Sequence, residues 1–379
     1  MKILFIGARL FDDVASYASK KGITTVLTES NNSESNIILA DIFHHVSRGM
    51  KEPIEIALKE DVDAVVPLIG VDRPLVEIGK MKEYLEKNYH IPVVASPVNA
   101  ANIAVNKFNT KKFFIKHKIK TPYYQKISYN NRDISLDQNL NFPIVLKPLE
   151  GQGGSGQKIV QSEKEFIHHL KNNGTVIAEE FIEGIEISVE VLRWRNKTLP
   201  LIPVNKGKTS LEGLHPLDKI KTAPVAIDGL DNDYIRDMAL RITNLLGSEG
   251  NNDVDMIFDP KTKNIYVLEM NTRPSGTRYI TTACSDINPM HELVDMASGQ
   301  WNIKNTKKRM KDYYSMEIPI LNYHELESKY DDNKNKKDFS RGNSWIIHGP
   351  PAFKRITIRD KSPKKAFSTI KKLGIDYKS

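Results

Sequence analysis

The stretch VLEMNTRPSGTR, from Val267 to Arg278, decides how the rest of this sequence is interpreted. An apolar run, IYVL, leads into it and predicts a β-strand that reaches the first polar residues. Because residues two apart in a strand point to the same face, Glu269, Asn271 and, if the strand continues, Arg273 project together. Two oxygen ligands beside one fixed cation suit a magnesium ion that carries a polyphosphate.

The segment NDVDMIFDP predicts the neighbouring strand of the same sheet. Its Asp255 lies 14 positions before Glu269, so a hairpin would bring a third oxygen ligand onto the same face. Acidic residues at strand ends also simply face solvent, and this pattern alone leaves that alternative open.

Length and composition bound the class of protein. A chain of 379 residues is long enough for two or three domains, and 40% hydrophobic with 27% charged residues is typical of a soluble globular protein. No apolar run reaches the roughly 18 residues that span a membrane, and the opening MKILFIGARLF is too short an apolar stretch for a signal peptide. The single cysteine, Cys284, excludes an internal disulfide and a cysteine-based zinc cluster. We therefore expect a cytoplasmic protein.

The net charge of +8 raises the question of a nucleic-acid partner. The cations are scattered, with denser patches at residues 304–311 and 334–337, and we find no zinc-finger spacing or RNA-binding aromatic signature. We therefore predict no nucleic-acid and no membrane partner. The charge is interpreted as a solvated basic surface that also favours anionic substrates.

Residues 1–96 alternate predicted strands and helices. Strands are predicted at MKILFIG, TTVLTES, DAVVPLIG and residues 91–96, and helices at residues 12–22 and 74–88. Strands that alternate with helical connections predict a parallel sheet. The turn GAR after the first strand lacks the three-glycine spacing of a dinucleotide site, so we expect this domain to be a substrate-facing scaffold.

A glycine loop follows in FPIVLKPLEGQGGSGQKIV. Four glycines between residues 151 and 156 would weaken a strand interior, but they suit a loop whose backbone amides close over phosphate oxygens. Lys147 ends the strand before this loop, where it can meet a phosphate. A plain flexible hairpin turn is the alternative.

Two further strands are predicted at VIAEEFI and EISVEVL, with Glu179 and Glu186 on either side of a glycine-containing turn. An ordinary acidic sheet edge would explain these glutamates equally well. Farther along, SDINPMHELVDMASG predicts a helix with an Asp/Asn cap, and SPKKAFSTIKKLG a final helix capped by Ser362. SWIIHGPPAFKRITIRD predicts a hairpin between them.

Five motifs in this order resemble the ATP-grasp superfamily, and within it the ATP-binding halves of carbamoyl phosphate synthetase. The resemblance covers roughly residues 100–300 and rests on NKFNTKKFFIKHKIKTP, IVLKPLEGQGGSG, IAEEFIEGIEIS, GLHPLDKIKTAP and VDMIF…VLEMNTRPS. It implies an α/β fold: an N-terminal parallel-sheet (pre-ATP-grasp, Rossmann-like) domain, a two-lobed α+β ATP-grasp domain and a small C-terminal α/β extension. The expected boundaries are residues 1–96, 97–303, with a lid lobe at about 110–185, and 304–379.

The resemblance implies a nucleotide site assembled from these motifs. Lys107 and Lys147 match the two basic residues that hold the phosphates of ATP, and the glycine loop matches the flap that closes over them. A hinge that reads adenine, largely through main-chain groups, precedes the acid that binds the ribose hydroxyls. The residues implied in these roles are Gly153, Gly154, Ser155 and Gly156 in the flap, Glu179, Glu180 and Ile182 in the hinge, and Glu186 at the ribose.

Metal and catalytic roles follow from the remaining motifs. The resemblance implies that Asp255, Glu269 and Asn271 bind one or two Mg²⁺ ions, with Mn²⁺ as an alternative. It also implies that Arg273 lies beside the transferred phosphate, and His215, in GLHPLD, resembles a histidine that carbamoyl phosphate synthetases place near the acceptor. The turn after Arg273 offers hydroxyls and amides to a substrate carboxylate. The predicted substrate contacts are Ser275, Gly276 and Arg278.

The sequence also departs from the family pattern. Asn-Thr-Arg stands where the family often has Asn-Pro-Arg, and the glutamate that biotin carboxylases carry shortly after this arginine is missing from RPSGTRY. No second synthetase half is present, so we expect the length of the chain to exclude a complete carbamoyl phosphate synthetase.

The leading hypothesis is an ATP-dependent carboxylate–amine ligase that acts on small molecules through an acyl phosphate and releases ADP. One alternative is a carbamoyl-phosphate-synthetase-like or carboxylase activity that uses bicarbonate. Another is a catalytically silent nucleotide-binding regulatory protein. The expected partners are a small carboxylate and an amine substrate, and a homodimer is the default assembly.

Overall fold

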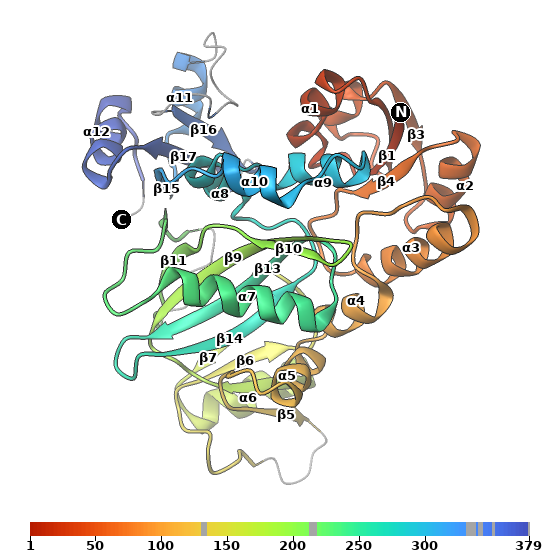
Figure 1. Cartoon of the computed structure of the whole chain (residues 1–379). Coiled ribbons are helices and arrows are strands. Elements are labelled where there is room, and N and C mark those ends of the chain that lie inside the picture. The colour runs from red at the N-terminus through yellow and green to blue at the C-terminus, as the bar shows by residue number, and fades with distance from the viewer. Residues whose placement is uncertain (130–134, 212–217, 331–338, 340–343, 351–352, 378–379) are drawn as a thin grey trace.

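The computed structural model describes the chain except residues 130–134, 212–217, 331–338, 340–343, 351–352 and 378–379. Three sheets organise it. The N-terminal sheet lies at one end, a long central sheet crosses the molecule, and a small lid sheet lies on one side of the central sheet (Figure 1). Within the described residues, no helix combines the length and apolar character needed to span a bilayer.

The N-terminal sheet is parallel, as predicted. Its strands follow the order β3-β2-β1-β4, with bounds Ile42–His45, Thr24–Glu29, Lys2–Ile6 and Ala64–Pro67. Alternate residues of β1 enter two separate hydrophobic clusters, because both faces of the sheet are covered. The predicted α/β class is thus confirmed. The surrounding helices are α1 (Ala15–Lys20), α2 (Lys51–Lys59) and α3 (Leu75–Tyr89), with 3₁₀ helices at Phe11–Asp13 and Ser35–Leu39.

Two local predictions for this region are wrong. The strand expected at residues 91–96 is reduced to one bridge between Val93 and Val65, because Pro92 cannot donate a ladder hydrogen bond and a second proline, Pro97, follows. The helix expected at residues 12–22 is divided into a 3₁₀ turn and α1. In that turn the amide hydrogen bonds reach back only three residues.

The central sheet has nine strands in the order β14-β13-β9-β11-β12-β15-β17-β16, and β10 pairs with β9. Strands from the C-terminal part of the chain therefore extend the same sheet that carries the glutamate-rich motifs. The bounds are β9 Ile185–Trp194, β10 Lys197–Pro200, β11 Val204–Lys208, β12 Lys221–Ala223, β13 Gly250–Asp259, β14 Asn264–Asn271, β15 Tyr314–Pro319, β16 Ser344–His348 and β17 Arg355–Asp360.

The two faces of this sheet differ in polarity. On one face Ile187, Val189 and Val191 of β9 pack with Val254 of β13 against helix α7 (Asn232–Leu246). The alternate positions of the same strands are polar, so the opposite face remains available for ligand contacts. The sequence pattern EISVEVL encodes this division directly.

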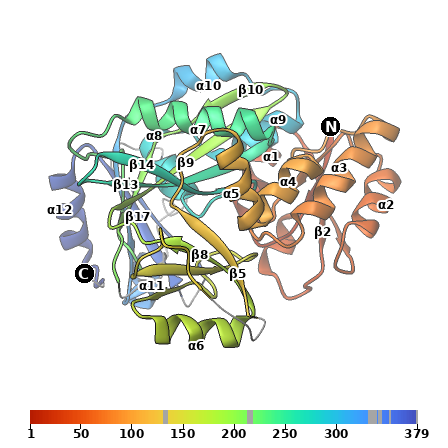
Figure 2. The ribbon, with the colours of Figure 1, turned by 90° about the horizontal axis from the view of Figure 1, so that it is seen from below.

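The lid sheet, whose strands β5 and β8 are labelled in Figure 2, has the antiparallel order β5-β8-β6-β7. It carries its own small hydrophobic core. The glycine loop joins β6 to β7, as predicted. The bounds are β5 Tyr124–Ser128, β6 Ile144–Pro148, β7 Lys158–Val160 and β8 Thr175–Glu180, with α5 (Lys107–Lys116) and α6 (Glu163–Asn173) alongside.

The remaining helices link or cover the sheets. Helix α9 packs between the N-terminal and central sheets, and α12 covers the C-terminal strands. Side-chain caps predicted from sequence are present: Asn288 caps α9 and Ser362 caps α12. The bounds are α4 Val98–Val105, α8 Arg278–Ser285, α9 Pro289–Ala297, α10 Ile303–Arg309, α11 Tyr323–Tyr330 and α12 Pro363–Leu373.

Candidate active site

A cavity of about 480 Å³ lies between the N-terminal loops, the glycine loop and the polar face of the central sheet. Most residues predicted for the site line it, although they come from distant parts of the chain. These are Lys107, Lys147, Gly153, Gly154, Ser155, Glu186, Asp255, Glu269, Asn271, Arg273, Ser275, Gly276 and Arg278. Gly156 instead lies against Pro148, and His215 lies outside the described residues.

A smaller pocket of about 100 Å³ adjoins this cavity and shares Lys147 and Glu186 with it. It contains the predicted hinge residues Glu179, Glu180 and Ile182. Its other walls mix apolar and polar side chains. The apolar ones are Pro122, Val145, Ile159, Phe181, Ile257 and Leu268, and the polar ones are Gln157, Thr209, Ser210 and Lys219. A pocket with apolar walls and polar groups at its edges, adjoining a cationic cavity, can hold a planar base at one end and phosphates at the other.

A buried ion network supports Lys147. The carboxylate of Glu179 lies 2.8 Å from Lys147 Nζ and 3.3 Å from Lys111 Nζ. Burial would raise the pKa of Glu179, but the two lysines hold it below its usual value. Burial lowers the pKa of Lys111 to about 8. Sequence reasoning missed Lys111, although its position four residues after Lys107 places both on one face of α5.

A β-bulge sets the direction of the predicted metal ligands. Asp255 of β13 pairs with Glu269 of β14, whereas Met256 pairs with Val267, so Leu268 is the extra residue. Without this bulge Glu269 would follow the alternation of Val267, which packs in the hydrophobic core. The bulge turns Glu269 to the polar face, where Asn271 joins it.

Charges surround the two carboxylates. Asp255 Oδ1 lies 2.7 Å from Lys206 Nζ, and Glu269 Oε2 lies 4.0 Å from Lys107 Nζ. Burial raises the pKa of Asp255 to about 7 against the attraction of Lys206, and the charge of Glu269 adds to the rise. Burial alone would raise the pKa of Glu269 as well, but Lys107 and Lys147 lower it to about 2.

This donor set fits a hard divalent cation. Two carboxylates and one amide face the cavity from adjacent positions, and the Asn271 amide group lies 3.5 Å from Glu269 Oε1. Among the described residues, no group of three or more acidic, histidine or cysteine side chains is spaced to hold a metal alone. Magnesium is commonly bound by one or two carboxylates together with substrate phosphates, which matches this incomplete set.

Arg273 follows the end of β14 rather than continuing the strand, but its side chain still lines the cavity. Its Nε lies 2.5 Å from Asp72 Oδ1, and its Nη2 donates to Asn271 Oδ1 at 3.2 Å. Asp72 also donates its backbone N–H to Gln152 of the glycine loop, at 3.4 Å. The guanidinium is therefore oriented by Asp72, from the loop after β4, and by Asn271, the last residue of β14.

The predicted substrate turn is only partly free to bind a ligand. The Ser275 hydroxyl is buried and donates to Asp253 Oδ2 at 2.9 Å. Arg278 Nε donates to Asp13 Oδ2 at 2.7 Å, and Nη1 contacts the Ser275 carbonyl at 3.3 Å. Gly276 remains on the cavity wall. We therefore expect Ser275 to act through Asp253 more than by direct contact.

Several cavity residues were missed by sequence reasoning. Lys206 and Lys219 neutralise Asp255 and Glu186, and the second pair is separated by 2.8 Å. Arg9 enters from the loop after β1. Simple alternation does not indicate the orientation of Lys206, because the register of β11 shifts between Asn205 and Gly207. The positions of Lys219 and Arg9 depend on tertiary packing.

The amino-acid sequence is similar to those of several known enzymes. A family described as "ATP-grasp domain" matches residues 104–277. A carbamoyl-phosphate synthase from Methanobrevibacter smithii is 43% identical over 365 residues, which are 96% of this chain and 98% of that protein. A D-alanine–D-alanine ligase from Pelagibacter ubique is 30% identical over 222 residues, which are 53% of this chain and 68% of that protein.

A solved structure shares the fold. The ADP complex of an N5-carboxyaminoimidazole ribonucleotide synthetase superposes with a TM-score of 0.76 at 18% identity, over 98% of this chain and 96% of that one. At this identity the likeness concerns the fold alone.

Proposed function

The chain belongs to the ATP-grasp family of ADP-forming ligases, and we propose that it joins a small carboxylic acid to an amine through an acyl phosphate. The observation that carries this proposal is the convergence, in one cavity, of the opposed carboxylates Asp255 and Glu269 with Lys107, Lys147 and Arg273. These groups come from three separate motifs, and an acidic pair beside several cations matches phosphoryl transfer.

In this proposal, the nucleotide occupies both adjoining pockets. The smaller pocket would hold adenine, and Glu186, which lines both pockets, would contact the ribose. Lys107 and Lys147 would contact the phosphates from the floor of the larger cavity. Asp255 and Glu269, with the Asn271 amide, would hold Mg²⁺, which supplies charge neutralisation for the transferred phosphoryl group.

The chemistry then has two steps. An oxygen of the substrate carboxylate attacks the γ-phosphorus, and the bond to the β,γ-bridging oxygen breaks, so that ADP leaves. The amine nitrogen next attacks the acyl carbon, loses a proton and expels phosphate. Arg273, held by Asp72, would stabilise the oxyanion of the tetrahedral intermediate.

Bicarbonate is a second candidate for the acid, with ammonia as the amine. The specific observation is the relative named carbamoyl-phosphate synthase, which this chain matches over nearly the whole of both lengths. A protein of similar size bears that name, so chain length does not argue against this activity. The same cavity would then form carboxyphosphate in place of a larger acyl phosphate.

Measuring ADP release against a no-acceptor blank tests these proposals. Purified chain is supplied with Mg²⁺ and ATP, and with either a panel of amino acids or bicarbonate, each with and without ammonia. Stimulation by an amino acid pair supports the ligase. Stoichiometric release with bicarbonate alone, unimproved by any amino acid, supports the second candidate. No release under any condition would leave the catalytically silent alternative.

A further inference from the structure

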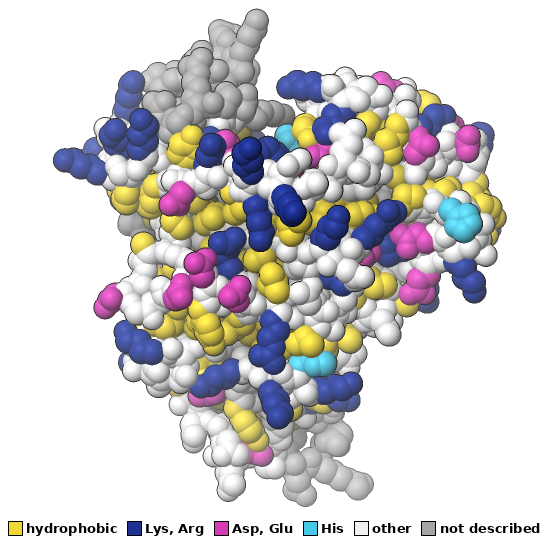
Figure 3. All heavy atoms as spheres, in the orientation of Figure 1, with side chains coloured by type: hydrophobic (Ala, Val, Ile, Leu, Met, Phe, Trp, Pro, Cys, Tyr) yellow, Lys and Arg dark blue, Asp and Glu magenta, His cyan; other side chains and the backbone are white. Residues whose placement is uncertain are grey.

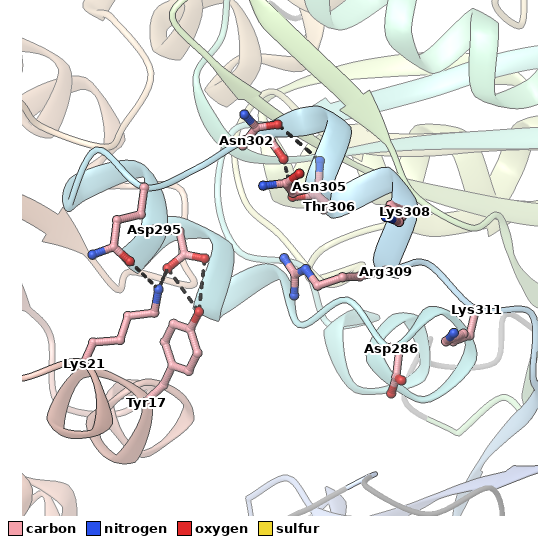
Figure 4. A pocket seen from close by; sticks show the side chains of 11 residues that line it. Tyr17, Lys21, Asp286, Asp295, Asn302, Asn305, Thr306, Lys308, Arg309 and Lys311 are labelled. Carbon is pink, nitrogen blue, oxygen red and sulfur yellow. Dashed lines mark hydrogen bonds and ion pairs between the residues drawn. The ribbon is translucent and has the colours of Figure 1, made fainter.

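A second cavity, of about 960 Å³, lies apart from the catalytic one, and the two share no lining residue. Its walls come from α1, from α9 and from α10 with the residues that flank it (Figure 4). The volume falls within the range of small-molecule sites, and the cavity is open to solvent rather than enclosed. Nothing in the proposed ligase reaction uses it.

Cations dominate this cavity. Four of its lining side chains are basic, Lys21, Lys308, Arg309 and Lys311, against the two carboxylates Asp286 and Asp295. The charges that line this cavity therefore sum to a positive value. On the face shown in Figure 3, Lys and Arg side chains are interspersed with acidic and hydrophobic ones.

Both carboxylates are already neutralised. Asp295 lies 2.6 Å from Lys21 Nζ and accepts from the Tyr17 hydroxyl at 3.0 Å. Asp286 lies 2.6 Å from Nη2 of the buried Arg359. Lys308 and Lys311 take part in no ion pair with another described residue, so they leave a net positive charge in the cavity.

An ion pair with a buried glutamate fixes the position of Arg309. Its Nη2 donates to Glu292 Oε1 at 2.7 Å, and the buried Glu292 also accepts from Trp301 at 3.1 Å and Thr306 at 2.9 Å. Its side chain is nevertheless 51% exposed, and it reaches across the cavity between Asp295 and Asp286 (Figure 4). A guanidinium fixed this way loses little conformational freedom on binding, and its fork matches phosphate oxygens.

We propose that this cavity binds a small phosphorylated molecule, through Arg309 together with Lys308 and Lys311. The two lysines without ion pairs balance the charge of a phosphate monoester, and Arg309 supplies directional hydrogen bonds. The basic run at residues 304–311, which the sequence suggests is a solvated surface, contributes these three cations.

The cavity also adjoins an element of the catalytic site. Asp286 directly follows α8, and Arg359 donates to the carbonyls of Ala283 at 2.6 Å and Thr282 at 3.0 Å in that helix. The first residue of α8 is Arg278, which lines the catalytic cavity. A ligand bound here would therefore lie at the opposite end of α8 from the catalytic centre.

Calorimetry with inorganic pyrophosphate as the probe tests this site. The full chain is first saturated with Mg²⁺ and a non-hydrolysable ATP analogue, so that the catalytic cavity is filled before titration. Wild-type protein should bind pyrophosphate, and the double variant Lys308→Gln, Lys311→Gln should bind it at least about tenfold more weakly. That variant breaks no ion pair among the described residues, so its fold should be retained.

Two further variants sharpen the test. Lys364→Gln with Lys365→Gln removes two exposed lysines from α12 and should leave the dissociation constant unchanged, which controls for net charge. Arg309→Lys retains a cation for Glu292 but removes the fork, and should weaken binding severalfold. Equal affinity in wild type and the Lys308/Lys311 variant, or no binding by wild type, would overturn the proposal. Either result would leave the ligase proposal untouched.

Discussion

Asp72 and Arg273 meet between the N-terminal loops and the central sheet, with Asp72 Oδ1 2.5 Å from Arg273 Nε. Each side chain is only 11% exposed. The backbone N–H of Asp72 reaches Gln152 of the glycine loop, and Arg273 also contacts Asn271. One residue of the first domain therefore touches both the candidate catalytic arginine and the loop expected to close over the nucleotide.

Asp72→Asn should lower kcat about tenfold, which corresponds to a loss of about 1.4 kcal/mol of transition-state stabilisation. The KM for ATP should change by less than about twofold. The amide removes a charge-assisted bond that orients the guanidinium but leaves the nucleotide contacts intact. Steady-state kinetics checks the split, and Asp72→Glu should restore part of kcat.

Asp63→Asn is the matched control, because this exposed carboxylate of the same domain accepts from the Lys2 backbone N–H and, among the described residues, contacts no part of the cavity. A parallel loss of kcat in both variants would indicate general damage to the domain. An unchanged kcat for Asp72→Asn would show that Arg273 needs no such support.

Glu269→Gln and Asn271→Ala should each abolish ATP turnover while the melting temperature stays close to that of wild type. Both side chains line the cavity rather than the core, and Glu269 is kept ionised by the surrounding lysines. Asp259→Asn, at the far end of β13, serves as the control. Wild-type turnover by either variant at ordinary Mg²⁺ concentrations would remove these residues from the metal site.

Lys147→Ala should weaken ATP binding and also destabilise the fold. The phosphate contact is worth roughly 1.5–3 kcal/mol, and the buried Glu179 would retain only Lys111 as an ion-pair partner. Lys147→Arg should retain most of the ATP affinity and most of the stability of the wild-type protein. Calorimetric titration with ATP measures the affinity, and urea unfolding measures the stability, so the two roles are separated. Unchanged ATP affinity with reduced stability would show that Lys147 has a purely structural role.

The orientation of Glu269 illustrates how far the sequence predicts the site. Alternation after Glu269 correctly anticipates that Asn271 shares its face, because the period of two is local. Alternation before it would place Glu269 with Ile265 and Val267 in the core. The bulge at Leu268 reverses this, and no glycine or other local signal announces it.

Contacts between distant segments limit prediction more severely. The alternation of strands with helical connections in residues 1–96 is sufficient to predict a parallel sheet. The pairing of β12 with β15 is not encoded locally, since it joins strands from separate motifs. The partners of Arg273 and Arg278 lie 201 and 265 positions away, so their orientation follows only from the folded domain arrangement.

Stability should depend on pH through Glu190. This buried carboxylate lies beneath the substrate turn and accepts from Thr277, Thr281 and Asn251. Burial raises its pKa to about 7, so the folded state binds more protons than the unfolded state between about pH 4.5 and 7. The Glu190 contribution to the free energy of unfolding should therefore fall as pH rises through that window, by about 3 kcal/mol, and then stay constant.

Glu190→Gln should abolish this slope and leave the protein more stable than wild type at pH 8. Urea unfolding at several pH values measures the difference between the two proteins, in which titrations common to both cancel. A difference that does not change between pH 4.5 and 8 would mean that Glu190 is ionised in the folded state throughout.

Arg278 distinguishes the two candidate acids. It lies five residues beyond Arg273 at the start of α8, so an extended acid could span both guanidinium groups, whereas bicarbonate, with a single carbon, would stay beside Arg273. Arg278→Ala should therefore raise KM for a larger acid and leave KM for ATP unchanged. Because this change also breaks the Arg278–Asp13 ion pair, Asp13→Asn is the control: it loosens the same contact but keeps the cation.

With an amino or peptide-like acid, we expect at least a fivefold higher KM for Arg278→Ala and little change for Asp13→Asn, an effect of about 1 kcal/mol or more. With bicarbonate as the acid, both variants should keep the wild-type KM. Ser275→Ala should have a smaller effect than Arg278→Ala, since its hydroxyl contacts Asp253 within the protein. If Asp13→Asn raises KM as much as Arg278→Ala does, the ion pair acts by shaping the turn, and Arg278 does not touch the acid.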